Sequence, residues 1–161
     1  MARDPAHAVG AASPPDWSLG PPTPPRTFHR DDLAAVRRDA VAHAAAHGLS
    51  TSRCTDVAIV VSELATNSVV HGGGWGTIAS WTDGRCVVHE IHDRGHFRTE
   101  QAGTFLPPPD QAGGRGLWLV AQLSDRVDRR SISAGTTTRV HLGPRPTPEV
   151  RKAADRAERS R

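Results

Sequence analysis

Long apolar runs and cysteine pairs are missing from this chain. No stretch of its 161 residues approaches the ~20 apolar residues that a membrane span requires. The first residues, Met1-Ala2-Arg3-Asp4-Pro5, lack the apolar centre of a signal peptide. Cys54 and Cys86 form no CxxC pair, which argues against a disulfide framework. These absences predict a cytoplasmic protein with no membrane partner.

Lysine is nearly absent, and the basic residues are not gathered in one place. Lys152 is the only lysine, and the formal net charge of +3 is small for this length. The arginines cluster only weakly, at Arg37-Arg38, at Arg129-Arg130 and near the C-terminus. Because a nucleic-acid-binding protein concentrates its basic residues on one stripe, we do not expect direct nucleic-acid binding.

Histidine is plentiful, but its spacing does not predict a zinc site. His89, His92 and His96 follow one another at intervals of three and four residues. On a strand, residues three apart point to opposite faces of the sheet. His89 and His92 are therefore not expected to hold one metal ion together.

Prolines mark both ends of the chain and separate them from the middle. Seven of them lie among residues 1–25. Because proline fixes φ and lacks an N–H donor, these residues are predicted to form a disordered or polyproline-like leader. Trp17 within it is interpreted as a docking element for a partner. Residues 144–161 are predicted to be a charged flexible tail, which leaves one folded domain over 26–143.

Helical periodicity predicts two long helices and a short one. The first begins near Asp31 or Asp32, either of which can cap it, and ends at Gly48 with a Schellman contact. The second covers 52–71, and the third, short and apolar, covers 117–123. The buried stripe of the second helix is expected to consist of Val57, Val60, Val61, Leu64 and Ser68.

Two pairs of alternating segments predict hairpins. Strands over 77–82 and 85–92 are joined by Asp83-Gly84, a strong signal for a type I′ turn, and strands over 126–132 and 136–142 turn at 133–135. The aperiodic residues 94–112 between the hairpins are predicted to be a functional lid. Segregated helices and hairpin-linked strands predict the α+β class, a two-layer sandwich whose mixed, mostly antiparallel sheet has helices on one face.

Glu63 and Asn67 are four residues apart on the second predicted helix, so they stack on one face. At 100° per residue they lie about 100° from the apolar stripe, beside the core, where a cleft can form. A carboxylate and a carboxamide placed in this way can hold hydrated Mg²⁺ and orient a nucleophile near a phosphate. The alternative is two polar residues on the wet side of an amphipathic helix.

Two glycine-containing motifs follow downstream. Asp93-Arg94-Gly95 ends a predicted strand and offers a carboxylate acceptor, although an aspartate here can also simply start a turn. Gly113-Gly114-Arg115-Gly116 precedes the short helix. Free N–H groups and the positive end of a helix dipole at this place suit phosphate groups, and Arg115 can add charge.

The order and spacing of these motifs resemble the ATP-binding (Bergerat, or GHKL) fold, and within it the bacterial anti-sigma factor serine/threonine kinases. The match to the family's N-box covers 63–72, from Glu-Leu-x-x-Asn to an apolar pair and His-Gly. By this resemblance, Asn67 ligates the Mg²⁺ that bridges the ATP phosphates. Glu63 is the catalytic base or orienting group for the incoming hydroxyl. His71 could reach phosphate; the alternative is a surface residue near the C-terminal cap of the helix.

The resemblance also implies where the nucleotide binds. Asp93 would accept a hydrogen bond from the adenine amino group, with Gly95 against the base, and Thr137 would contact adenine from the last strand. Phe97 departs from the family's Asp-x-Gly-x-Gly motif, which has glycine at this position. The cofactor-binding set is completed by the residues that close the ATP lid and begin the next helix: Gly114, Arg115, Gly116 and Leu117.

The resemblance implies a regulator that works by partner switching. Such a protein binds a sigma factor, and it uses ATP and Mg²⁺ to phosphorylate a serine or threonine of an anti-anti-sigma (STAS) partner; a homodimer is a further possibility. The alternative is a nucleotide-gated binding module with little phosphate transfer, which Phe97 keeps open. A histidine-kinase ATPase domain ranks last, because no upstream helical hairpin with a phosphoacceptor histidine is found. Gyrase- or MutL-type ATPases need more chain than this.

Overall fold

A computed structural model describes residues 15–18, 20–96 and 114–145. The predicted lid therefore lies largely outside the described residues, as do Phe97, Gly113 and nearly all of the predicted tail. In chain order the elements are β1 (Arg26–His29), the 3-10 helix η1 (Arg30–Asp32), α1 (Leu33–Ala46), α2 (Thr51–His71), β2 (Trp75–Asp83), β3 (Cys86–Asp93), α3 (Arg115–Leu123), β4 (Arg126–Ile132) and β5 (Gly135–Leu142).

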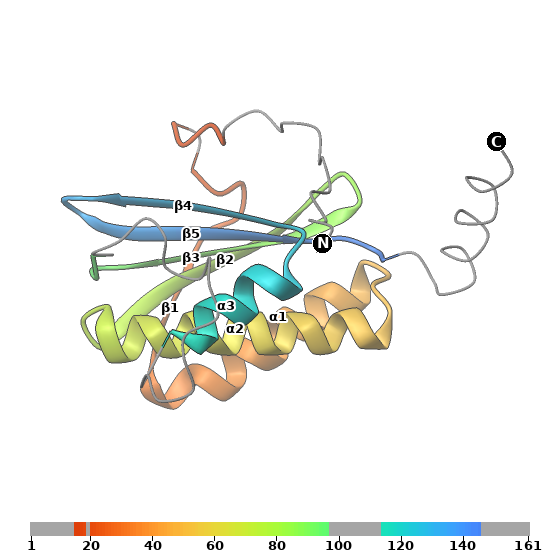
Figure 1. The fold of residues 1–161 in the computed structure, drawn as a ribbon, viewed down its shortest axis with the longest axis horizontal. Helices are drawn as coiled ribbons and strands as arrows, with labels where there is room; N and C mark the ends of the chain where they lie inside the picture. Colours follow the sequence, from red (N-terminus) through yellow and green to blue (C-terminus); the bar gives the residue numbers. More distant parts are fainter. Residues whose placement is uncertain (1–14, 19, 97–113, 146–161) are drawn as a thin grey trace, which may run out of the picture.

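The strands form one five-stranded sheet in the order β1-β2-β3-β5-β4. Every neighbouring pair is antiparallel, so the α+β class is confirmed, while the described sheet is wholly antiparallel rather than mixed. The three helices lie on one face of it (Figure 1). Strand β1 was not predicted, because four residues are too short to show alternation. None of the described helices is both long and apolar enough to pass through a membrane.

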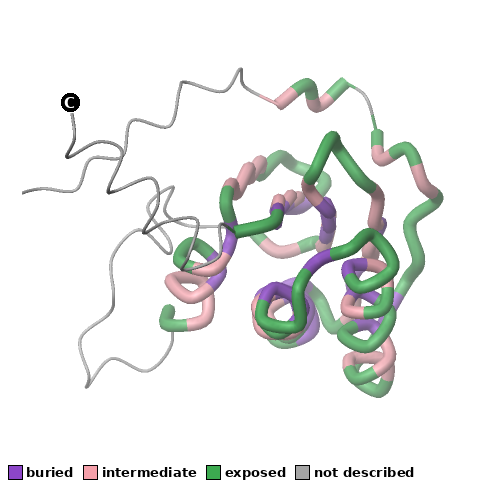
Figure 2. Tube along the Cα trace, turned by 90° about the vertical axis from the view of Figure 1, so that its right-hand side faces the viewer, coloured by how far each residue is buried: buried purple, intermediate pink, exposed green. Residues whose placement is uncertain are grey.

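The hydrophobic core lies between the helices and the sheet. The predicted stripe of α2 is confirmed, since all five of its residues are buried. Viewed from the side, buried residues gather where the helices and the sheet face each other (Figure 2). The core is completed by apolar side chains from β1, α1, α3, β3 and β5: Phe28, Val36, Ala40, Ala44, Val87, Ile91, Val120, Val140 and Leu142.

The ends of α1 confirm one prediction and correct another. Gly48 has φ +82°, and the N–H of Leu49 donates to the carbonyl of Ala44 over 3.1 Å, as expected for a Schellman motif. At the other end, the side chain of Asp32 makes no cap hydrogen bond to the helix. It accepts instead from the backbone N–H of His29, at 2.9 Å, and so caps the preceding turn.

The turn between β2 and β3 is not the type I′ turn predicted at Asp83-Gly84. Asp83 pairs with Cys86, so the two central residues are Gly84 and Arg85. Gly84 has φ +59°, but no described residue other than glycine has a positive φ. A type I′ turn needs positive φ at both central positions, whereas glycine at the first position alone is typical of type II′.

Arg53, at the start of α2, fixes the position of α3. Its buried guanidinium donates to the carbonyls of Leu123 and Gly143, both at 2.8 Å, and to the carboxylates of Asp56 at 2.8 Å and Asp125 at 2.9 Å. A buried charge held by this many partners costs several kcal/mol to disrupt, about 3–5 in comparable pairs. The end of α3 is therefore anchored to α2 and to the residues after β5.

His89 makes the stability of the fold depend on pH. This side chain is fully buried on the helix face of β3, where burial and the neighbouring His43 lower the pKa of its imidazole to about 3. An unfolded histidine titrates near pH 6.5, so between about pH 6.5 and pH 3 only the unfolded chain takes up this proton, and stability falls as the pH falls. We expect the free energy of unfolding to drop by about 2 kcal/mol between pH 6.5 and pH 5 from this group.

Urea denaturation across this pH range measures the effect. His89→Gln should give a flatter pH dependence than the wild-type protein, whereas the exposed His47→Gln should leave the slope unchanged. Equal slopes for the wild-type protein and His89→Gln would contradict the assignment.

Candidate nucleotide-binding site

The end of α2, the end of β3 and the start of β5 meet around Asp93. The N–H of Arg94 donates to the carbonyl of Gly72 over 3.1 Å and ties the end of β3 to the end of α2. Asp93 is paired with Thr136 on β5. We call Ser68, Gly72, Asp93, Gly95 and Thr136 the Asp93 cluster.

The carboxylate of Asp93 is held by hydrogen bonds at both oxygens. Oδ2 accepts from the hydroxyl of Ser68 at 2.6 Å, and Oδ1 accepts from the N–H of Gly95 at 2.8 Å. Ser68 is buried in the core stripe of α2, and the sequence predicts it only as part of this stripe. In the structure it also orients the carboxylate of Asp93. Each carboxylate oxygen keeps further lone pairs for a ligand.

Two glycines allow the chain to approach Asp93 closely. A Cβ at Gly72 would lie 2.5 Å from Cγ of Asp93, and one at Gly135 would overlap the carbonyl oxygen of the same residue. Gly135 also has φ +132°, which side chains rarely adopt. The glycine after His71 and the glycine that begins β5 are therefore steric requirements of the Asp93 cluster.

Glu63 and Asn67 lie one turn apart on α2, both half-buried, and Glu63 faces α3. A Cβ at Gly116, in the first turn of α3, would overlap Oε2 of Glu63. A carboxylate beside the N-terminal end of a helix interacts favourably with its dipole. Within the part of the chain that the structure describes, the side chains of Glu63 and Asn67 make no hydrogen bond or ion pair, so both remain available to a ligand.

The start of α3 is where the sequence predicts phosphate binding. Gly114 caps the helix with φ +87°, and Arg115 is exposed. Gly116 is half-buried beside Glu63. Leu117, predicted to be part of the cofactor-binding set, packs against the hydrophobic core.

The structure does not bring Thr137 to the Asp93 cluster. Its hydroxyl lies 3.1 Å from Nδ1 of His92, on the sheet face that carries no helix. Thr136 and Thr138 are the buried threonines on the helix face, and the hydroxyl of Thr136 donates to the carbonyl of Gly95 over 2.7 Å. Because side chains alternate along a strand, Thr137 points to the face opposite that of its neighbours Thr136 and Thr138.

The predicted opposite orientation of His89 and His92 is confirmed. His89 is buried on the helix face, and His92 lies on the other face. His71, predicted to reach phosphate, is exposed at the end of α2. Across residues 15–18, 20–96 and 114–145, no three His, Cys, Asp or Glu side chains gather as a metal site.

Two solved structures are similar to this chain in fold or in part of it. The RsbU and RsbW domains of Rv1364c from Mycobacterium tuberculosis share 23% identity with the chain, at a TM-score of 0.52 over 78% of this chain and 34% of that one. A blue-light activated histidine kinase from Erythrobacter litoralis shares 18% identity at a TM-score of 0.46, over 68% of this chain and 41% of that one. The TM-score of the first structure shows that the two folds are similar. The chain spans about a third of the length of that structure. No curated protein sequence matches significantly.

The family comparison covers nearly all of the folded residues. Residues 27–142 match the family described as the histidine kinase-like ATPase domain. The matched range runs from β1 to the end of β5, and it contains α2, the Asp93 cluster and the start of α3. The chain therefore belongs to the histidine kinase-like ATPase domain family.

Proposed function

We propose that this chain binds Mg·ATP between the Asp93 cluster and the start of α3, and that it is an anti-sigma regulatory factor with serine/threonine kinase activity. The supporting observation is that α2 carries both halves of the site. Ser68 orients Asp93, and five residues earlier Glu63 lies against α3. At 1.5 Å per residue the two points are about 7–8 Å apart along the helix, a span that one nucleotide can bridge.

At position six of a purine, Asp93 can recognise the amino group of adenine. Its carboxylate accepts hydrogen bonds and, when ionised, donates none. The amino group at position six of adenine is a donor, whereas guanine has a carbonyl there, which a carboxylate repels. The bonds from Ser68 and Gly95 hold this acceptor in place before a nucleotide arrives.

The phosphates would lie at the other end of the site, by Asn67 and α3. A bound Mg²⁺ would neutralise phosphate charge, and it takes oxygen ligands such as the carboxamide of Asn67. Because no cluster of acidic residues surrounds Asn67 within the described ranges, the ion would draw most of its ligands from the nucleotide and water. Glu63 would orient the attacking hydroxyl of the partner and accept its proton.

The proposed partners rest on the sequence motif. The Glu-Leu-x-x-Asn-Ser-x-x-His-Gly-Gly pattern over 63–73 resembles that of the anti-sigma kinases, whose partners are a sigma factor and a STAS-domain anti-anti-sigma factor. This role places the protein in the cytoplasm. The alternative is a nucleotide-gated binding module without transfer. It is favoured by Phe97 and by the contact of Glu63 with α3, because a carboxylate that packs against this helix can have a structural role instead of a catalytic one.

Phosphate transfer distinguishes the two functions. The full chain is incubated with γ-labelled ATP, Mg²⁺ and candidate STAS-domain proteins, with Glu63→Gln as the matched control. Label on a serine or threonine of a partner, lost in Glu63→Gln, supports the kinase. Tight nucleotide binding without transfer to any candidate supports the module, and absence of both binding and transfer contradicts both functions.

A further inference from the structure

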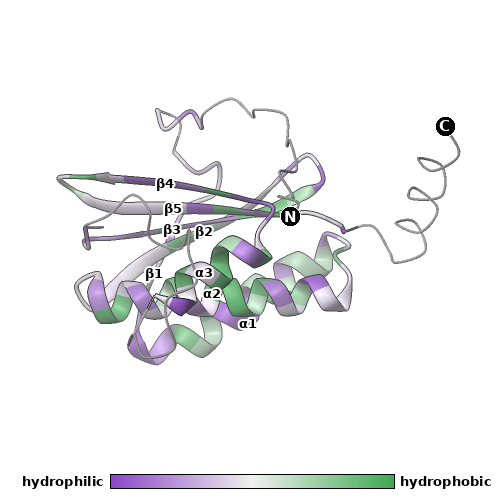
Figure 3. Cartoon of the chain, viewed as in Figure 1, coloured by the Kyte–Doolittle hydropathy of each residue, from purple (hydrophilic) through white to green (hydrophobic). Residues whose placement is uncertain are grey.

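The sheet face opposite the helices is partly buried although no helix covers it. Ala79 on β2 and Val88 on β3 are 4% and 0% exposed, yet neither belongs to the core cluster beneath the helices. Their neighbours on this face, which we call the outer face, include Trp81 and Arg139. Strand β4 along its edge is largely hydrophilic (Figure 3). The outer face therefore has buried apolar side chains without a helix over them.

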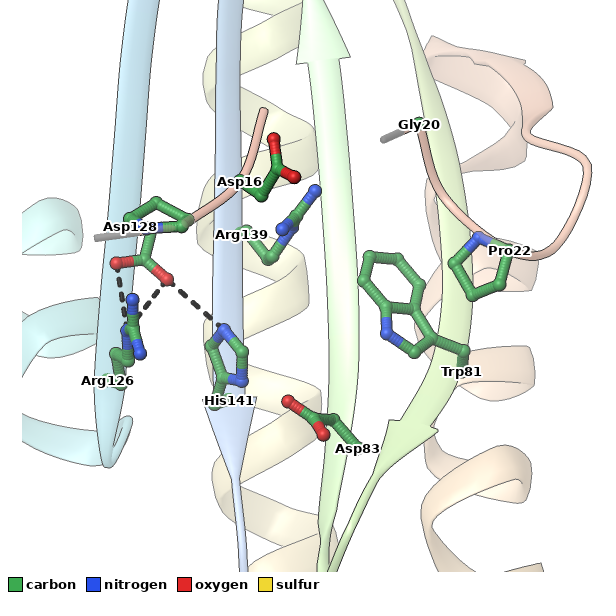
Figure 4. A pocket seen from close by; sticks show the side chains of 10 residues that line it. Asp16, Gly20, Pro22, Trp81, Asp83, Arg126, Asp128, Arg139 and His141 are labelled. Atoms are coloured by element: carbon green, nitrogen blue, oxygen red, sulfur yellow. Dashed lines mark hydrogen bonds and ion pairs between the residues drawn. The ribbon is translucent and has the colours of Figure 1, made fainter. Parts of the chain in front are cut away.

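The end of the predicted leader lies against the outer face. The hydroxyl of Thr23 donates to the carbonyl of Ser80 on β2 over 3.0 Å. Residues of the leader and of the sheet together enclose a hollow of about 540 Å³, with Pro22 beside Trp81 and the carboxylate of Asp16 turned toward Arg139 (Figure 4). Residues 15–18 and 20–25 of the predicted leader thus lie along the outer face.

Trp17 is the anchor of this segment. Its ring contacts two guanidinium groups, since the Cζ atoms of Arg130 on β4 and Arg139 on β5 are each 4.9 Å from the ring centroid. Cation–π contacts of this kind are most favourable with tryptophan. Trp17, interpreted from the sequence as a docking element for a partner, contacts the protein's own sheet in this structure.

Residues of the sheet hold the guanidinium of Arg139 in position for its contact with Trp17. Glu90, opposite Arg139 on β3, accepts from its Nε at 2.9 Å and from its Nη2 at 2.6 Å. The Cζ atom of Arg139 also lies 5.3 Å from the ring centroid of Trp81. A guanidinium that a carboxylate and one indole ring already hold loses little freedom when Trp17 docks.

We propose that the outer face is a docking surface for an extended segment in which a tryptophan follows a carboxylate and prolines flank the pair, and that residues 15–18 and 20–25 of the leader occupy it in cis. A partner segment of the same chemistry binds only when the leader is displaced. The leader thereby controls access to the outer face, on the side of the sheet away from the proposed nucleotide site.

Binding of the leader peptide in trans tests this proposal with the full chain. A fluorescent peptide of residues 15–25 is titrated against wild-type protein and against Trp17→Ala, and anisotropy is measured. In the wild-type protein the attached leader competes, so we expect the peptide to bind Trp17→Ala at least tenfold more tightly. Trp17→Phe, which keeps an aromatic ring, should resemble the wild-type protein, and the same peptide with its tryptophan replaced by alanine should not bind.

A second variant tests the receptor. Arg130→Ala, introduced together with Trp17→Ala, should weaken peptide binding at least tenfold while circular dichroism shows the same fold. Equal affinity of the peptide for wild-type protein and Trp17→Ala, no binding to Trp17→Ala, or binding indifferent to Arg130 would each overturn the proposal.

Discussion

Asn67→Ala is expected to weaken Mg·ATP binding by at least about tenfold, or ~1.4 kcal/mol, and to abolish measurable phosphate transfer. The reason is that Asn67 supplies the carboxamide oxygen proposed to ligate Mg²⁺, and the alanine side chain supplies no ligand. The fold should be almost unaffected, because this half-buried side chain has no hydrogen bond or ion pair among the described residues. Changes at such positions usually alter stability by less than about 0.5 kcal/mol.

Calorimetric titration with ATP, in the presence of Mg²⁺ and with EDTA, measures this prediction. Thr66→Ala is the matched control, since Thr66 is exposed on the same turn of α2 and belongs to neither half of the proposed site. Glu63→Gln should differ from Asn67→Ala by keeping most of the binding while losing transfer. If Asn67→Ala transferred phosphate at the wild-type rate, the assignment of this residue to Mg²⁺ would be wrong.

The parts of the fold that follow from local periodicity could be predicted from the sequence. The stripe of α2 and the four hairpin strands are examples, because each depends on residues a few positions apart. Strand β1 and the docking of Trp17 depend on pairing with segments far along the chain. A four-residue strand and a proline-rich leader carry no local signal for such contacts.

The site shows the same division. Glu63 and Asn67 could be placed on one face of α2 by counting, and Asp93 at the end of a strand by alternation. Which of the three consecutive threonines face the helices depends on the register between β5 and β3, and that register is set by the whole sheet. The orientation of Asp93 by Ser68 was also missed, because serine in a helical stripe resembles any small core residue.

Because of the hydrogen bond between Ser68 and Asp93, Asp93→Asn should change nucleotide recognition without disturbing the fold. The hydroxyl of Ser68 also lies 3.1 Å from the carbonyl of Leu64, to which it can donate instead. In Asp93→Asn the amide oxygen can keep the bond from the N–H of Gly95, and the amide nitrogen can donate to Ser68. The domain should therefore fold normally while one of the two acceptor atoms becomes a donor.

We expect Asp93→Asn to lose at least about tenfold in affinity for ATP and most of its preference for ATP over GTP. An amide can rotate to present either a donor or an acceptor, so it no longer rejects the carbonyl of guanine. Parallel fluorescence titrations with ATP and GTP give both affinities. Ser68→Ala is the control, because it removes the bond that orients the carboxylate but leaves the carboxylate itself, so affinity should fall while the preference for ATP remains. Undiminished discrimination against GTP in Asp93→Asn would mean that adenine is recognised elsewhere, and the proposed site would have to be moved away from the end of β3.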